Sequence, residues 1–179
     1  MKILLHICCA PCLIYPLKRL ADQGFEVKGF YYNPNIYPVG EYNRREETTR
    51  SLSGVLQFDI EYSEYRPSEF SQAINANKQA PERCVSCWRL RLQKTALYAK
   101  ENGFDAFSTT LLVSPYQNQE LLRQLGRQTA KELEIDFYYE DFRVGFKQAH
   151  EEARSKGIYC QKYCGCSYSE LERNIKVKK

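Results

Sequence analysis

Short apolar runs alternate with longer amphipathic or polar stretches along this chain. The apolar runs predict strands, at 2–7, 26–33, 58–65, 105–113 and 135–142. The stretches with helical spacing predict helices at 13–23, 41–56, 84–103, 121–134, around 146–155 and near 168–176. KILLHI, the first run, is uniformly apolar, as expected of a strand that is buried on both faces. Residues 66–82 show no regular pattern and are expected to form an irregular connection.

Strands that alternate with helices indicate β-α-β units. The expected architecture is therefore a three-layer α/β fold, in which a parallel sheet of about five strands has helices on both faces. No repeat, linker or low-complexity tract interrupts the 179 residues, so the sequence predicts a single domain at 1–179. The last residues, KVKK at 176–179, are expected to be a basic tail.

Charge leaves the partners of the protein open, whereas hydropathy bears on its cellular location. The formal net charge of +4 and the isoelectric point near 8.6 permit a nucleic-acid partner without requiring one. The apolar start, MKILLHICCAPCLIYPL, has no small-residue cleavage site and is shorter than the ~20 residues of a membrane span. We therefore expect a cytoplasmic protein with no membrane segment, in which thiols stay reduced.

The eight cysteines point to metal or redox chemistry. Ligands of open parallel sheets sit beyond the carboxyl ends of the strands, where the first strand is followed by Cys8 and Cys9. Cys84 and Cys87 have the C-x-x-C spacing that lets one helical turn grip a metal or a cluster edge. Four thiolates suit a [4Fe-4S] cluster or a structural zinc, and an adjacent pair is untypical of zinc knuckles, which favours the cluster. Ordinary buried cysteines are the alternative.

A second cysteine pattern, CQKYCGC, lies near the end of the chain. One glycine separates Cys164 from Cys166, so the backbone can turn tightly and bring the sulfurs together. A disulfide in so small a ring would be strained and therefore reducible, and Lys162 could favour the thiolate. Further metal ligands or inert thiols are the alternatives, and Cys160 is interpreted as incidental.

Few other titratable side chains suggest chemistry. His6 lies inside the first strand, where a core histidine bonded to backbone is expected, and His150 in a polar helix is expected to be solvated. Asp141 follows the fifth strand and is a candidate ligand or proton donor, while a surface pair with Arg143 is slightly favoured. Two histidines give little support to a Ser-His-Asp hydrolase.

Four segments in order, HICCAPC, ERCVSCWRLRL, FSTTLLVSPYQN and YCQKYCGCSYS, resemble the signature of the cobalamin-independent epoxyqueuosine reductases, the QueH family. They span residues 6–169. The resemblance implies a fold of the nucleotide α-hydrolase (HUP-like) type, and tRNA as the substrate. The implied reaction is reduction of epoxyqueuosine to queuosine at the wobble position, with electrons from a donor that the sequence does not identify.

The same resemblance implies roles for individual cysteines. Cys8, Cys9, Cys84 and Cys87 would be ligands of a [4Fe-4S] cluster, and Cys164 with Cys166 would be a redox-active pair. The family also suggests a second iron or other divalent metal. Cys12 and Asp141 are both candidates to bind it, and the sequence does not choose between them.

Two other functions remain open at this point. A tRNA sulfur-transfer enzyme of similar fold would also need cysteines and a cluster. Such enzymes usually bind ATP through a glycine- and serine-rich loop after the first strand, where this chain has HICCAPC. A zinc-stabilised binding module without catalysis is the third possibility, and it would be colourless.

Overall fold

The centre of the molecule is a parallel sheet of five strands in the order β3-β2-β1-β4-β5. The computed structural model describes residues 1–177. The strands are β1 (Lys2–His6), β2 (Glu26–Tyr31), β3 (Ile60–Tyr62), β4 (Ala106–Thr109) and β5 (Asp136–Phe137). Leu4 in β1 pairs with Lys28 of β2 on one side and with Phe107 of β4 on the other. This central place explains why the β1 sequence is apolar without alternation.

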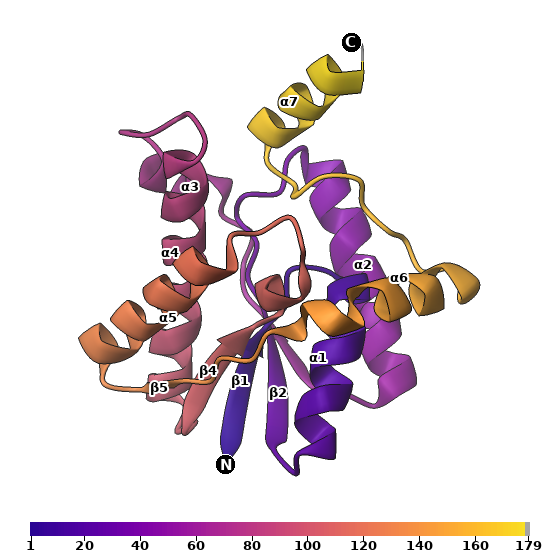
Figure 1. The fold of residues 1–179 in the computed structure, drawn as a ribbon, viewed down its shortest axis with the longest axis vertical. Coiled ribbons are helices and arrows are strands. Elements are labelled where there is room, and N and C mark those ends of the chain that lie inside the picture. Colours follow the sequence, from indigo (N-terminus) through magenta and orange to yellow (C-terminus); the bar gives the residue numbers. More distant parts are fainter. Residues whose placement is uncertain (178–179) are drawn as a thin grey trace.

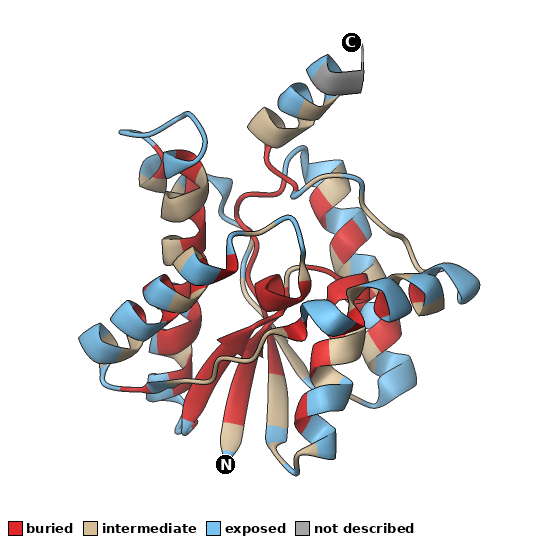
Figure 2. Cartoon of the chain, viewed as in Figure 1, coloured by how far each residue is buried: buried red, intermediate tan, exposed pale blue. Residues whose placement is uncertain are grey.

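Helices cover both faces of the sheet (Figure 1). They are α1 (Ala10–Asp22), α2 (Val39–Leu56), α3 (Pro67–Ala73), α4 (Glu82–Glu101), α5 (Gln119–Leu133), α6 (Phe146–Ser155) and α7 (Ser167–Val177). α4 and α5 pack together on one face, and α1 packs on the other face with α2 and α6 beside it. Burial is concentrated in the strands and in the helix sides that face them (Figure 2). The expected three-layer α/β architecture is confirmed.

Three predicted segments were wrong in type or extent. The predicted strand at 105–113 ends at Thr109, and Thr110–Val113 form a short 3-10 helix, η1, because the Thr109 hydroxyl caps the Leu111 amide. The predicted strand at 135–142 shrinks to the two residues of β5. Its end belongs to a second 3-10 helix, η2 (Phe142–Gly145). The connection at 66–82 contains α3, which begins at Pro67.

Smaller differences concern the ends of elements. α1 begins at Ala10 instead of residue 13, since Pro11 is well suited to the first turn of a helix, and this places Cys12 on the helix. α2 begins at Val39 instead of 41, and β3 keeps only the middle of its predicted range. The predicted basic tail at 176–179 starts within α7, and its last two residues lie outside the described residues.

The carboxyl ends of the strands form the edge of the sheet that faces α7 (Figure 1). η1 follows β4 at this edge, and the segment 156–166 leads from α6 to α7. The segment after β2, residues 32–38, leads to α2. Cys8 and Cys9 lie in the turn between β1 and α1, and the other six cysteines lie in the segment 156–166 or in the first turns of α1 and α4. Among residues 1–177, no helix combines the length and apolarity that crossing a membrane requires.

Candidate metal and thiol site

Three thiols meet where β1 passes into α1. The Sγ atoms of Cys8, Cys9 and Cys12 all lie within 4.8 Å of one another, and among the described residues they form the one such group of possible metal ligands. Cys9 and Cys12 are buried, and Cys8 is half-buried. The turn is short because Cys9 is the N-cap of α1 and Pro11 occupies its first turn. This group could hold a metal ion.

Neighbouring polar groups hold the three thiols in place. The Thr110 hydroxyl donates to Cys8 Sγ at 3.2 Å and accepts from the Cys8 amide at 3.0 Å. The Gln161 side chain donates to Cys9 Sγ at 2.7 Å from a segment more than 150 positions away. η1 and the segment before α7 therefore both close on the thiols that follow β1.

The hydrogen bonds divide the protons unequally among the three thiols. Hydrogen bonds from Cys12 and Cys9 lower the pKa of Cys8 well below its usual range. The pKa of Cys12 is raised, mainly because its thiol proton is shared with Cys8, and burial raises the pKa of Cys9. Cys8 is thus the thiol of the three that ionises most easily, and a bound cation would favour release of protons from all three.

Cys84 and Cys87 lie in the first turns of α4, with the spacing that puts both on one side of the helix. Cys87 is buried in a small apolar cluster with Phe70, Ile74 and Cys166. Burial raises the pKa of Cys84 and raises that of Cys87 to about 11. The structure therefore brings the C-x-x-C pair next to the C-G-C segment. It does not bring Cys84 or Cys87 within the 4.8 Å of the first group.

Arg91 is the side chain that relates the two sets of thiols. It lies one helical turn after Cys87, is 3 % exposed, and donates to Asn33 Oδ1 at 2.7 Å. Its Nε lies 3.3 Å from His6 Nε2. Its positive charge lowers the pKa of Cys8 and opposes the effect of burial on Cys87. The thiols after β1 and those of α4 thus share one cationic neighbour and do not lie on opposite sides of the protein.

The C-G-C segment forms a tight turn, as its sequence predicts. Gly165 has φ +122°, and the Sγ atoms of Cys164 and Cys166 lie 3.7 Å apart as free thiols. Hydrogen bonds from Cys166 and Ser169 lower the pKa of the exposed Cys164 to about 7, and the same contact raises the pKa of Cys166. The main groups that favour the Cys164 thiolate are therefore Cys166 and Ser169, and Lys162 is not among the main ones.

Arg45, on α2, holds the C-G-C turn in place. Its guanidinium is 2 % exposed and donates to the carbonyls of Tyr163 and Cys164 at 3.2 and 3.1 Å. Glu41 accepts from Arg45 Nε at 2.7 Å. The Tyr37 amide donates to the Gly165 carbonyl at 2.8 Å. The start of α2 therefore determines where the C-G-C turn lies.

The other sequence candidates lie in less suggestive surroundings. His6 is fully buried, with Nε2 3.2 Å from the Tyr32 carbonyl, which confirms a core histidine, and burial followed by Arg91 lowers its pKa to about 3. Asp141 forms the expected pair with Arg143, at 2.5 Å, and caps η2. Cys160 contacts the Ile158 carbonyl at 3.5 Å.

His150 differs from its prediction. Its ring packs on Phe146 with centroids 4.2 Å apart, and its Nε2 is buried with no partner among the described residues. It is therefore half-buried, although its helix is mostly polar. The reason is that α6 packs on α1, which covers one side of the helix.

Sequence reasoning missed the roles of Arg45, Arg91, Thr110 and Gln161 at this site. Arg91 had one usable signal, its position four residues after Cys87, which places the two on the same side of a helix. Gln161 had the signal of lying beside three cysteines. Arg45 had no such signal, since it lies in a run of charged residues that is typical of a solvent-exposed helix face.

The family model and the relatives that match this chain all name the same family. Residues 3–172 match the family model described as epoxyqueuosine reductase QueH. A relative from Dehalococcoides mccartyi, named epoxyqueuosine reductase QueH, is 38% identical over 173 residues, which cover 96% of this chain and 94% of the relative. One with the same name from Thermotoga maritima is 34% identical over 182 residues, covering 97% and 93%.

Solved structures show a related fold at low identity. A protein described as a predicted subunit of tRNA methyltransferase from Methanocaldococcus jannaschii aligns with a TM-score of 0.57 at 13% identity, covering 86% of this chain and 74% of the other. A deacetylase of teicoplanin biosynthesis aligns with a TM-score of 0.50 at 12% identity, covering 87% and 85%. These likenesses confirm the expected fold class.

Proposed function

This chain belongs to the epoxyqueuosine reductase QueH family, and we propose that it reduces epoxyqueuosine to queuosine in tRNA. The main support is the family match over residues 3–172, a range that contains every cysteine of the chain. The reaction removes the epoxide oxygen as water and leaves an alkene, so it consumes two electrons and two protons.

The thiol chemistry suits an iron-sulfur cluster. We propose Cys8, Cys9, Cys84 and Cys87 as the ligands of a [4Fe-4S] cluster, which would supply single electrons and a Lewis-acidic iron for the epoxide oxygen. A four-iron cluster is larger than one ion, so its ligands need not lie as close together as those of a single cation. The positive charge of Arg91 beside both pairs would offset the negative charge of the thiolates.

A second metal, iron or another divalent ion, is better served by Cys12 than by Asp141. The Cys12 Sγ lies in the same group as those of Cys8 and Cys9. The Asp141 carboxylate is already paired with Arg143 and caps η2, so binding a metal would cost it both contacts. Cys12 is therefore our candidate for the second metal.

Cys164 and Cys166 have the arrangement of a dithiol that can supply the reaction. Oxidation of two thiols to a disulfide releases two electrons and two protons, which matches the demand of the epoxide. The reduced sulfurs lie 3.7 Å apart, and the thiolate of Cys164 is favoured near neutral pH. A separate electron donor would have to reduce the disulfide again after each turnover.

Replacing Cys164 or Cys166 by serine tests that role. With no outside reductant, single-turnover reduction should be lost in either variant. Cys160→Ser is the matched control, because Cys160 lies in the same segment and contacts only a backbone carbonyl. Undiminished reduction in Cys164→Ser would remove the dithiol from the reaction.

One experiment tests the function as a whole. The protein is reconstituted anaerobically with iron and sulfide, and is then incubated with epoxyqueuosine-bearing tRNA and a chemical reductant. Digestion of the tRNA to nucleosides should reveal a product lighter by one oxygen atom. A coloured, cluster-bearing protein that leaves the nucleoside unchanged would contradict the proposal, and a colourless zinc protein would favour a binding module.

The sulfur-transfer alternative has less support. The turn after β1 contains three thiols and a proline, where ATP-dependent enzymes of this fold usually have a glycine- and serine-rich loop. A cytoplasmic location and a single domain at 1–179 remain predictions that fit the proposed reaction.

A further inference from the structure

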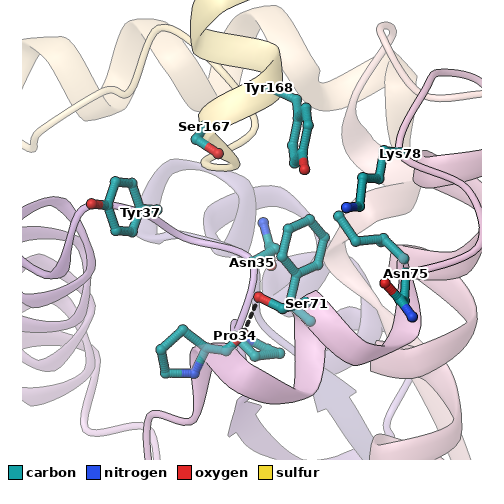
Figure 3. Close-up of a pocket in the computed structure, with 11 residues that line it drawn as sticks. Pro34, Asn35, Tyr37, Ser71, Asn75, Lys78, Ser167 and Tyr168 are labelled. Atoms are coloured by element: carbon teal, nitrogen blue, oxygen red, sulfur yellow. Dashed lines mark hydrogen bonds between the residues drawn. The ribbon is translucent and has the colours of Figure 1, made fainter.

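A cavity of about 410 Å³ opens beside the C-G-C turn, between α3, the start of α7 and the segment after β2. Figure 3 shows Tyr168 and Ser167 on one side of it, Lys78 and Asn75 on another, and Asn35 at its centre. The volume lies within the range of ~300–1,000 Å³ typical of small-ligand pockets. The cavity is therefore large enough for a nucleobase with a substituent.

The cavity is polar at its base and aromatic around it. Asn35 is 2 % exposed, and its Oδ1 has no hydrogen-bond partner among residues 1–177. A buried amide oxygen without a partner costs about 1–3 kcal/mol, so a ligand or water that pairs with Asn35 is favoured. Tyr37 and Tyr168 contribute rings to the lining, and Lys78 contributes a cation.

Tyr168 is held in place before any ligand arrives. The guanidinium of Arg83, on α4, lies 4.9 Å from the centre of the Tyr168 ring. Arg83 is also paired at 2.9 Å with Glu172, which lies on α7 with Tyr168. Arg83 also donates to the Lys78 carbonyl at 3.0 Å. One buried arginine thus ties α7 to the segment that follows α3, and these are two sides of the cavity.

The cavity also adjoins the reactive thiols. Phe70 and Ile74 line it, and the same two side chains form the apolar cluster that contains Cys87 and Cys166. Tyr168 packs against that cluster. A molecule in the cavity is consequently separated from these thiols by a single layer of side chains or less.

We propose that this cavity receives the epoxyqueuosine base, turned out of the anticodon loop, with Tyr168 against its ring and the Asn35 amide on its polar edge. The inference rests on the proposed function and adds to it the place where the substrate binds. Base stacking on aromatic side chains is sequence-tolerant, whereas a buried amide reads one edge of the base. Lys78 would then be available to a phosphate of the same RNA strand.

Blocking the cavity tests the inference. Ser71 lines the cavity and is exposed, and its hydroxyl contacts only the Pro67 carbonyl of its own helix at 3.2 Å. Ser71→Trp would fill the space without removing a tertiary contact of the serine. Ser68→Trp is the matched control, because Ser68 is exposed on the same helix and is not part of the lining. Asn75→Trp is a second blocking variant, from another side of the cavity.

Binding of two anticodon stem-loops to the anaerobically purified protein gives the measurement. One stem-loop contains epoxyqueuosine, and the other has an abasic wobble nucleotide. The wild type and Ser68→Trp should bind the first about tenfold more tightly, as expected for one stacked base. Ser71→Trp and Asn75→Trp should bind both equally, at the affinity of the abasic RNA, while their melting temperatures stay near that of the wild type.

The outcomes separate this inference from the proposed function. Equal binding of both RNAs by the wild type would overturn the inference, whether or not the protein reduces epoxyqueuosine. A preference that survives in Ser71→Trp and Asn75→Trp would also overturn it. A different outcome is possible, in which the wild type prefers the epoxyqueuosine stem-loop, both blocking variants lose this preference, and the reduction assay fails. That outcome would count against the proposed reaction and would support the binding site.

Discussion

Removing the Arg45 side chain should release the C-G-C turn from the rest of the protein. Arg45 lies on α2, more than 115 positions before the carbonyls of Tyr163 and Cys164 that it binds. It is also paired with Glu41, whose side chain is 12 % exposed. The Tyr159 hydroxyl donates to the same carboxylate at 3.0 Å. Arg45→Met would keep an unbranched stem like that of arginine and remove every donor of the guanidinium.

The expected loss follows from what the substitution leaves behind. Glu41 would keep a mostly buried negative charge with the Tyr159 hydroxyl as its remaining hydrogen-bond donor among residues 1–177, and two carbonyls would lose their donor. Removing one partner of a buried ion pair costs about 3–5 kcal/mol of unfolding free energy. Adding Glu41→Gln should restore about 1–2 kcal/mol, because the unpaired charge would then be gone.

Urea unfolding gives the total, with Arg50→Met as the control. Arg50 lies on the same helix and pairs with Glu46 at 2.6 Å, but its side chain is 53 % exposed. Its loss should cost about 1 kcal/mol, from an exposed ion pair and a contact with the Tyr62 ring. If Arg45→Met is no less stable than Arg50→Met, Arg45 does not anchor the turn.

Three further predictions concern protonation and packing. The alkylation rate of Cys164 should rise with pH around a midpoint near 7, and Cys166→Ser should move this midpoint to higher pH, because the Cys166 thiol is the main group that stabilises the Cys164 thiolate. Mass spectrometry of the modified peptide gives the rates, and an unmoved midpoint would contradict the assignment. The folded pKa of His6, about 3, lies below its unfolded value, so its contribution to stability is lost as pH falls from about 6.5 to 3. Between pH 7 and pH 5, the free energy of unfolding of the metal-free protein should fall by about 2 kcal/mol because of this group. Urea titrations of His6→Gln should lack this decrease. Gly126→Ala should cost about 1–3 kcal/mol, because its new methyl group would overlap the aromatic ring of β5, whereas Gly54→Ala has open space and should gain about 0.5–1 kcal/mol; equal thermal shifts in the two variants would refute the packing argument.

Much of the fold could be predicted because its signals are local. The apolar run at 2–7 is short and lies before a proline, and it forms the central strand. The run at 105–113 looks the same by periodicity, yet half of it is a 3-10 helix. The difference comes from the Thr109 hydroxyl, which caps the following turn, and such a local hydrogen bond leaves no trace in an apolar pattern.

The candidate site divides in the same way. The thiols after β1 and the C-G-C pair could be located because their spacing in the chain brings them together. Arg45 could not, because its partners are distant carbonyls and every neighbour in sequence suggests a solvated helix face. The cavity beside Asn35 had no sequence signal either, since three distant segments form it.

Arg91 gives an independent reason to interpret the nearby thiols as anions. A buried guanidinium is costly unless a negative charge lies close to it. Arg45 meets that need through Glu41, but Arg91 donates to the neutral side chains of Asn33 and His6. Among residues 1–177, no carboxylate forms an ion pair with it. Arg91 lowers the pKa of Cys8 and opposes the burial that raises the pKa of Cys87 to about 11, so thiolates at these two positions, which the proposed cluster would require, would balance its charge.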